Sequence, residues 1–308
     1  MRISEEAAAS RPALYHYRHR LGNFDVIVVS DGIHQVRITP HDMRNVSFEQ
    51  YKAALVAAYL STETLGRHHN PVVVDTGVKL VLIDTGNVHN LIPGTGLLAA
   101  GLEAAGIDRK AIDIVLITHL DHDHIGGLRD PEGRAAFPNA EIKVPAGNWN
   151  YFTRDEYLPS PVRPEGWPRS LMTEYDMIML VRQTFATLPN RVVRFEPGEE
   201  VVPGITSIAT SGHSPGHVSY LVTSQGESLV VAGDVSGNPF TTLRNPGWHP
   251  AADVDGPQAE ASRRRLFDMI AEKRALVSGY HFPFPSLGHV EKHGDGYRLI
   301  PIWWNPVM

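Results

Sequence analysis

Short apolar runs recur along the chain, and their spacing divides them into two series. Each run is rich in β-branched residues and is bounded by glycine, proline, asparagine or aspartate, a pattern that predicts buried strands. The first series covers 24–30, 71–75, 78–84, 114–118 and 141–144, and the second covers 205–210, 218–223, 228–232 and 275–278. Because a further run, 33–38, follows the turn signal at Asp31 and Gly32, we expect it to form a hairpin with 24–30.

Helical patterns lie between the strands. Gly106 is placed to end a helix over 97–105, and Pro257 opens a long helix that continues to about 274. The order strand, helix, strand around 97–105 puts that helix on one face of a sheet. Two strand-rich halves with helices outside predict an α/β protein in which two mixed β-sheets pack face to face, an αββα sandwich.

No flexible linker or low-complexity tract divides the chain, so we expect residues 1–308 to form a single domain. The predicted additions to this domain are an N-terminal extension over about 1–22 and an insertion over the cleft at about 148–188. The insertion contains aromatic residues that include Trp149 and Phe152. Such a group is more often core than substrate wall, and the wall of a substrate pocket is the alternative.

Composition narrows the expected partners and compartment. The formal net charge is −6 and there is no long basic run, so electrostatics favour neither nucleic acid nor an anionic membrane as a partner. The stretch 1–21 lacks an apolar core of signal-peptide length, and the longest apolar runs are too short to span a bilayer, so we expect a cytoplasmic protein. With 16 histidines and no cysteine, a metal site here must use histidine, aspartate and glutamate.

The most unusual stretch begins where the strand 114–118 ends. Five imidazoles and carboxylates fall within six residues there, namely His119, Asp121, His122, Asp123 and His124. Two glycines follow and allow a tight turn into a helix. Because α/β sheets carry their chemistry at the carboxyl ends of strands, this cluster indicates a metal site rather than a solvated acidic loop.

This stretch resembles the metallo-β-lactamase superfamily motif THxHxDHxGG. The resemblance assigns His119, Asp123 and His124 as metal ligands. Asp121 stands where the motif has its second histidine, so an ungapped alignment makes Asp121 a ligand as well. The alternative is that Asp121 turns away and His122 takes its place.

Three later segments complete the ligand set that the resemblance implies. The segment 211–217 resembles the GHTPGH element, which makes His213 a ligand and His217 a structural residue. Asp234 matches the aspartate that bridges two metals in the family, and His281 matches the terminal histidine. The implied first site is His119, Asp121, His213 and Asp234, and the second is Asp123, His124, His281 and Asp234, with Asp123 and Asp234 as the catalytic residues.

The segments 28–32, 80–86 and 281–289 resemble the methyl parathion hydrolase branch of the superfamily. This resemblance implies a homodimeric, dinuclear metal hydrolase that acts on a small-molecule substrate. It would use a hydroxide bridging two divalent ions to cleave an aryl ester, a lactone or a phosphotriester. Zinc is the first choice of metal, with manganese, iron or cobalt as alternatives.

Further residues are expected to support this site. Trp149, Phe152 and Phe282 are the candidate substrate-binding residues, and Asp84 and His122 are the candidates for orienting the metal ligands. Carboxylates commonly hold metal-bound imidazoles in this way. For Asp84 the alternative is a turn aspartate that caps its own backbone.

Two departures limit the analogy. Acyl-homoserine lactonases of the superfamily carry a tyrosine three residues after the bridging aspartate, and Gly237 in that position argues against their substrate. Asp121 adds a carboxylate, which lowers the charge of a cluster of two divalent ions and one hydroxide and makes harder ions more favourable. Two other functions therefore stay open: an iron-dependent oxidoreductase on the same fold, and a binding protein with a decayed metal site.

Overall fold

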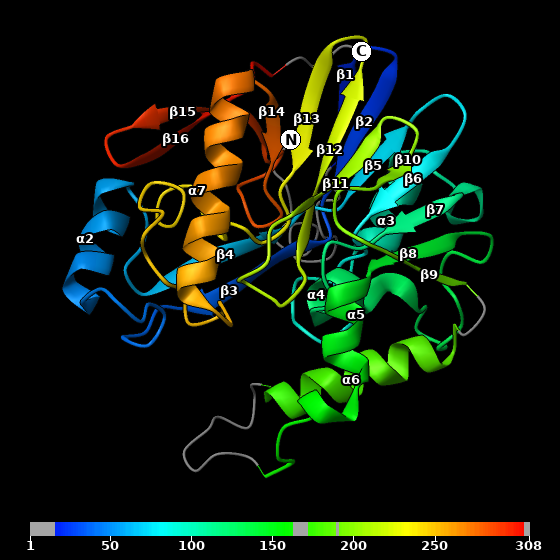
Figure 1. The fold of residues 1–308 in the computed structure, drawn as a ribbon, viewed down its shortest axis with the longest axis horizontal. Helices are drawn as coiled ribbons and strands as arrows, with labels where there is room; N and C mark the ends of the chain where they lie inside the picture. Colours follow the sequence, from blue (N-terminus) through cyan, green and yellow to red (C-terminus); the bar gives the residue numbers. More distant parts are fainter. Residues whose placement is uncertain (1–15, 163–171, 189–190, 305–308) are drawn as a thin grey trace, which may run out of the picture.

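The computed structural model describes residues 16–162, 172–188 and 191–304 and arranges them in layers (Figure 1). Two seven-stranded sheets pack face to face, and helices cover their outer faces. The alternation of side chains along the strands produces these layers. Val26 and Val28 belong to the core between the sheets, whereas Ile27 and Val29 belong to the core beneath the helices of the first sheet. The predicted αββα sandwich is confirmed.

The first sheet takes its strands from the N-terminal two-thirds of the chain. Its order is β1 (His16–Leu21), β2 (Phe24–Val29), β5 (Val72–Asp75), β6 (Leu80–Ile83), β7 (Ile114–Leu116), β8 (Glu141–Pro145) and β9 (Val192–Phe195). β5 and β6 pair antiparallel, as the predicted hairpin requires, and β6 to β9 pair in parallel. Helix α3 (Leu98–Ala104) and the short helix η1 (Arg109–Ala111) connect β6 to β7, as the pattern predicts.

The second sheet is antiparallel except at one pair of strands. Its order is β10 (Glu200–Val202), β11 (Ile205–Ala209), β12 (Val218–Ser224), β13 (Glu227–Val231), β14 (Leu276–Ser278), β15 (Leu287–His293) and β16 (Gly296–Pro301). β13 and β14 pair in parallel, and helix α7 (Gly256–Lys273) connects them across the outer face. Asp255 caps α7 by accepting a hydrogen bond from the Gln258 amide, and proline occupies its first turn.

The predicted hairpin between 24–30 and 33–38 is wrong. β2 pairs with β1 and β5, whereas β3 (Gly32–Arg37) pairs with β4 (Thr64–His69) in a separate two-stranded ribbon, and α2 (Phe48–Ala57) lies between them in sequence. The reason is Asp31, which is fully buried rather than placed in a turn. Its carboxylate accepts hydrogen bonds from the backbone amides of Asn87 and Leu98, both at 2.8 Å, and these bonds direct the chain out of the first sheet.

Two expected additions to the domain look different in the structure. Residues 16–21, expected to be part of the N-terminal extension, form the edge strand β1, and residues 1–15 lie outside the described part. The expected insertion contains α5 (Ala146–Thr153), η3 (Asp155–Tyr157) and α6 (Glu174–Ala186), and 163–171 lie outside the description. α6 buries Ile178, Val181 and Phe185 against the core of the first sheet.

The described helices do not include one that is both long and apolar enough to cross a membrane.

Candidate metal centre

The segments that follow four strands converge at one edge of the sandwich. β7 leads into His119 and the short helix α4 (His122–Ile125), which η2 (Gly126–Leu128) follows. β11 is followed by His213, β13 by Asp234 and β14 by His281. The structure therefore brings together all seven side chains that the sequence analysis assigned as ligands. Each sheet holds its strand ends in fixed positions, so the side chains that follow them are held close together.

The two glycines after the histidine cluster allow α4 to pack closely on the loop after β6. A Cβ atom on Gly127 would lie 2.0 Å from the Thr85 carbonyl oxygen, and one on Gly126 would lie 2.1 Å from the Val88 amide nitrogen. Both separations are too short for any side chain. The Thr85 amide also donates to the His124 carbonyl at 2.7 Å, so this contact sets the position of α4.

A first group of potential ligand atoms surrounds Asp121. Its Oδ2 lies 3.5 Å from His119 Nε2 and 3.6 Å from His213 Nε2, and His213 Nε2 lies 3.5 Å from Asp234 Oδ2. Two atoms that each bind a tetrahedral zinc ion at about 2.1 Å are roughly 3.4 Å apart. The spacing of this group therefore fits one ion.

A second group lies on the other side of Asp234. His281 Nε2 is 3.0 Å from Asp234 Oδ2 and 3.4 Å from Asp123 Oδ2, and His124 Nε2 is 3.4 Å from Asp234 Oδ1. Asp234 contacts histidines of both groups, so its carboxylate is positioned to bridge two ions.

The geometry favours Asp121 over His122 as the fourth member of the first group. Asp121 Oδ2 faces two histidines of the cluster, whereas Nδ1 of His122 lies 3.8 Å from the nearest carboxylate oxygen, on Asp123. At that distance His122 makes no hydrogen bond with Asp123. Among the described residues, His122 Nδ1 therefore has no hydrogen bond by which it would orient that ligand.

The imidazoles of the cluster are oriented by partners on their outer nitrogens. Nδ1 of His124 contacts Asp84 at 2.8 Å, Nδ1 of His213 contacts Asp253 at 3.1 Å, Nδ1 of His281 contacts the His68 carbonyl at 2.7 Å, and Nδ1 of His119 contacts the Thr118 hydroxyl at 3.1 Å. A proton on each Nδ1 leaves the lone pair of each Nε2 directed into the cluster.

Buried atoms without partners provide a test of whether these residues fit a metal. Within the described part of the chain, Nε2 of His119, Nε2 of His124 and Oδ1 of Asp234 are buried and make no hydrogen bond. Leaving such an atom unsatisfied costs about 1–3 kcal/mol. Three such atoms of the right chemical type, pointing at one another, fit a site for divalent cations.

Asp84 and Asp253 occupy equivalent positions around the two groups. Asp84 was expected either to orient an imidazole or to cap its own turn. It contacts His124 and also accepts from the Thr118 amide and hydroxyl, each at 2.8 Å. Asp253 was missed because it belongs to no recognisable motif. One signal was available, since Arg263 lies at helical spacing from Ala259 and Phe267, on the buried face of α7, and a buried arginine needs a carboxylate partner. Arg263 donates to Asp253 at 2.9 Å.

Charge couples the members of the cluster. Burial acts to lower the pKa of His213, but its carboxylate neighbours, Asp121 first, outweigh burial and raise the pKa to about 10. The pKa of His124 is raised well above its usual value against burial in the same way, with Asp84 as the largest contributor. Without ions the cluster is thus held by imidazolium and carboxylate pairs, and a divalent cation would replace protons on binding.

His217 lies behind the cluster, where the resemblance placed a structural residue. It is fully buried, its Nε2 accepts a hydrogen bond from the Asp234 amide at 3.0 Å, and its Nδ1 contacts the Thr210 hydroxyl at 2.9 Å. Both ring nitrogens are therefore occupied by contacts within the protein, which leaves neither for a metal.

The aromatic residues expected to bind substrate lie elsewhere. Phe152 and Phe282 are buried in two different hydrophobic cores, and Trp149 packs against the first core with its ring 5.0 Å from that of Phe185. This corrects the expectation for Phe152 and Phe282, whose apolar surface is taken up by core packing, whereas Trp149 is half-buried and its role in substrate binding stays a prediction.

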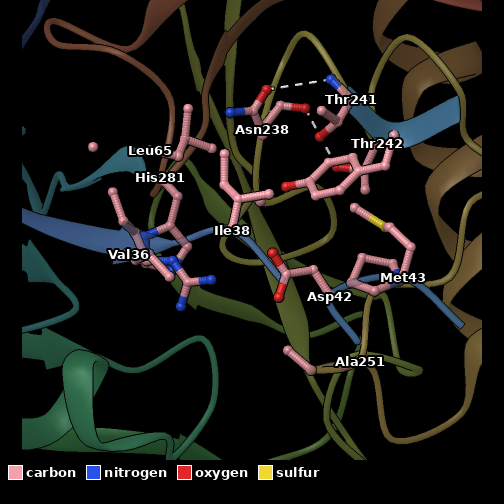
Figure 2. A pocket seen from close by; sticks show the side chains of 16 residues that line it. Val36, Ile38, Asp42, Met43, Leu65, Asn238, Thr241, Thr242, Ala251 and His281 are labelled. Atoms are coloured by element: carbon pink, nitrogen blue, oxygen red, sulfur yellow. Dashed lines mark hydrogen bonds between the residues drawn. The ribbon is translucent and has the colours of Figure 1, made fainter. Parts of the chain in front are cut away.

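A cavity of about 240 Å³ opens beside the second group at His281 (Figure 2). Its apolar lining comes from β3, β4 and the segments around them, and its polar lining comes from the loop after β13 together with the charged side chains of Asp42 and Arg67. The main lining residues are Val36, Ile38, Met43 and Leu65 on the apolar side and Asn238, Thr241 and Thr242 on the polar side. The sequence pattern offered one clue to this cavity, since Val36 and Ile38 share one face of an extended segment.

Comparison with known proteins agrees with the geometry. The family model of the metallo-beta-lactamase superfamily matches residues 65–281. An N-acyl homoserine lactonase from Bacillus cereus is 26% identical over 255 residues, which cover 77% of this chain and 83% of the lactonase.

Two solved structures have the same fold over almost the whole chain. AidC, a dizinc quorum-quenching lactonase in complex with the product N-hexanoyl-L-homoserine, superposes with a TM-score of 0.87 at 21% identity, covering 96% of this chain and all of that one. The hydrolase AbOPH superposes with a TM-score of 0.84 at 25% identity and the same coverage. Since the family model spans well over half of the residues and includes the whole cluster, this chain belongs to the metallo-beta-lactamase superfamily.

Proposed function

We propose that the protein is a dinuclear metal-dependent hydrolase that opens the ring of a lactone carrying an apolar substituent. The observation that carries this proposal is the position of Asp234 between two groups of potential ligands, 3.5 Å from His213 on one side and 3.0 Å from His281 on the other. A single carboxylate shared by two such groups is what a pair of adjacent ions requires.

The residues of the chain hold and orient this centre. Two divalent ions, when bound, would supply Lewis acidity and lower the pKa of a water molecule towards neutrality. Asp84 and Asp253 fix the tautomers of His124 and His213, so that unprotonated nitrogens face the ions. Asp123 and Asp234, the proposed catalytic residues, would accept the proton that the water molecule loses during hydrolysis and return it to the leaving group.

The substrate class follows from the cavity and from the relatives. His281 belongs both to the ligand groups and to the cavity lining, so a substituent in the cavity would hold its carbonyl group next to the ions. Val36, Ile38 and Leu65 form an apolar wall that suits an acyl or alkyl substituent, and Asp42 and Arg67 add charged groups to the same cavity. The curated relatives and AidC hydrolyse N-acyl homoserine lactones, which carry such a substituent.

Gly237 helps to explain how a lactone would fit without the tyrosine of other lactonases. Gly237 lines the cavity, and no described atom lies within 4 Å of the place where its Cβ would be. The space directly around this Cβ position is therefore open. We propose that the substrate itself fills this volume.

The ligand atoms of the two sites indicate which metal ions the protein prefers. Four imidazoles favour zinc, as in AidC, while Asp121 adds an oxygen ligand that makes manganese, iron or cobalt more competitive at the first site than at the second.

The test combines metal counting with a substrate panel. Protein purified without chelator should hold two ions per chain and hydrolyse acyl-substituted lactones faster than aryl esters or phosphotriesters. Asp234→Ala should lose both ions, whereas His217→Ala should mainly reduce stability and serves as the buried control. Well under one ion per chain would favour a decayed site, and oxygen consumption without hydrolysis would favour an oxidoreductase; either result overturns the proposal.

A further inference from the structure

His69 ends strand β4 beside the second group, and its contacts resemble those of the assigned ligands. Its side chain is 1% exposed, and its Nδ1 finds no hydrogen-bond partner among the described residues. This nitrogen lies 3.4 Å from Oδ2 of Asp123, and the ring packs edge-on against His281 with centroids 5.0 Å apart. Ligand atoms of these three residues all lie within 4.8 Å of one another.

The opposite ring nitrogen of His69 has an outer partner. Nε2 lies 3.1 Å from Nδ1 of His34, which is half-buried on the neighbouring strand β3, and the two rings stack. A neutral His69 ring whose Nε2 donates to Nδ1 of His34 directs the lone pair of its own Nδ1 towards Asp123.

A lone pair that faces a carboxylate oxygen across 3.4 Å is repelled by it unless a proton or a metal ion lies between the two atoms. The separation is also the one expected for two ligands of the same tetrahedral zinc ion, roughly 3.4 Å. His69 thus shows three features of the assigned imidazoles: an occupied outer nitrogen, a buried inner nitrogen without a partner, and ligand spacing to a neighbouring carboxylate.

We infer that His69 is a further ligand of the second ion, bound through Nδ1 alongside Asp123 and His281. The inference rests on the proposed dinuclear centre. With His69 included, the ligand sets of the two metal sites differ. The first site includes the Asp121 carboxylate, and the second includes the neutral imidazole of His69. Imidazole favours zinc and carboxylate favours harder ions, so zinc should be retained at the second site when manganese competes.

The test measures zinc per chain during dialysis against increasing concentrations of a chelator, together with the melting temperature of each metal-free variant. In His69→Ala and His69→Gln, one of the two zinc ions should be lost at a chelator concentration at least about tenfold lower than in the wild type. His68→Ala is the matched control, because it removes the adjacent imidazole and keeps the carbonyl that contacts His281. It should release zinc like the wild type.

The glutamine variant separates a ligand from a hydrogen-bond donor. Glutamine can still donate to Asp123 but is a poor zinc ligand, so wild-type retention of zinc in His69→Gln would overturn the inference, as would wild-type retention in His69→Ala. If the variants do not fold, a crystal structure of the zinc-loaded wild type decides: an Nδ1 to zinc distance of about 2.0–2.1 Å supports the inference, and a distance beyond bonding overturns it. A wild type that never holds two ions would instead contradict the proposed function.

Discussion

Asp253 accepts a hydrogen bond from Nδ1 of His213 at 3.1 Å, although the two residues lie 40 positions apart in the chain. Its second oxygen pairs with Arg263, which is 1% exposed and also donates to three backbone carbonyls. The orientation of a metal ligand is therefore linked to a buried ion pair on helix α7.

Asp253→Asn should weaken metal binding and stability together. The outer partner of His213 is altered, which should reduce affinity for the first ion by about 10- to 100-fold. Arg263 is left as an unpaired buried charge, which should cost the metal-free protein about 3–5 kcal/mol of unfolding free energy. Chelator competition measures the first effect and urea unfolding the second.

Asp295→Asn is the matched control for that variant. Asp295 pairs with the neighbouring arginine, Arg264, at 3.0 Å, but its side chain is exposed to solvent. Loss of this exposed ion pair should leave the metal affinity unchanged and should change the free energy of unfolding very little. Equal effects of the two substitutions would mean that Asp253 does not act through His213.

The metal-free protein should become less stable as pH rises from about 6.5 to 10. The pKa of His213 is raised to about 10 in the folded state and that of His124 is raised as well. A group with a raised folded pKa contributes stability that is complete below its unfolded pKa of about 6.5 and is lost as pH rises through the folded value. The buried histidines whose pKa values are lowered change the stability only at pH values below this window. A metal-free melting temperature that is constant or increases between pH 7 and 10 would contradict this.

Metal binding should release protons in the same pH window. His124 and His213 must be deprotonated to bind an ion through Nε2, and their raised pKa values mean that they carry protons in the metal-free protein at pH 7. Calorimetric titration with zinc in buffers of different ionisation enthalpy should therefore give heats that depend on the buffer. Buffer-independent heats would mean that these imidazoles are neutral before the metal binds.

Asp121→His should restore the family motif and change the preferred metal. Replacing a carboxylate near His119 and His213 with a neutral imidazole makes the centre more positive and shifts its preference towards zinc over manganese. A more positive centre favours ionised water, so the acid limb of the pH–rate profile should move to lower pH.

Two alanine variants check which side chain is the ligand. Asp121→Ala should retain one ion per chain, whereas His122→Ala should retain both, because His122 Nδ1 approaches Asp123 at 3.8 Å and belongs to none of the groups of close ligand atoms. The reverse pattern in metal counting would assign the ligand to His122 and show that the ungapped alignment is wrong.

Gly237→Phe should change substrate selection without changing metal content. The added ring would enter the open part of the cavity beside Asn238 and compete with a long substituent. We expect KM to rise several-fold for lactones with long acyl chains and to change little for short ones. Gly237→Ala is the size control and should resemble the wild type. A uniform loss of kcat across chain lengths would point to a disturbed metal centre instead.

Local sequence determined much of this protein. The apolar runs predicted the strands because an extended buried segment needs little more than β-branched residues between turn residues. The candidate ligands could be found for a related reason. Each directly follows a strand or sits in a short motif, so His119, His213, Asp234 and His281 could be placed from neighbours in sequence, and the sheets bring those strand ends together.

Tertiary packing decided the features that depend on contacts between residues distant in sequence, such as which strands pair. The run 33–38 pairs with β4 rather than β2 because buried Asp31 binds amides more than 50 residues away. An alternating pattern specifies that a segment is a strand but not which strand it joins.

The same limit applies around the metal centre. Asp253 and His69 carry no local motif, and their roles arise only where α7 and the β3–β4 ribbon meet the strand ends. The cavity is formed by both the ribbon and the loop after β13, whereas Phe152 and Phe282, two of the predicted substrate-binding residues, are buried in two different cores. Burial is a property of the packed chain, so the side chains left to contact a substrate become identifiable only after packing has assigned the others to the interior.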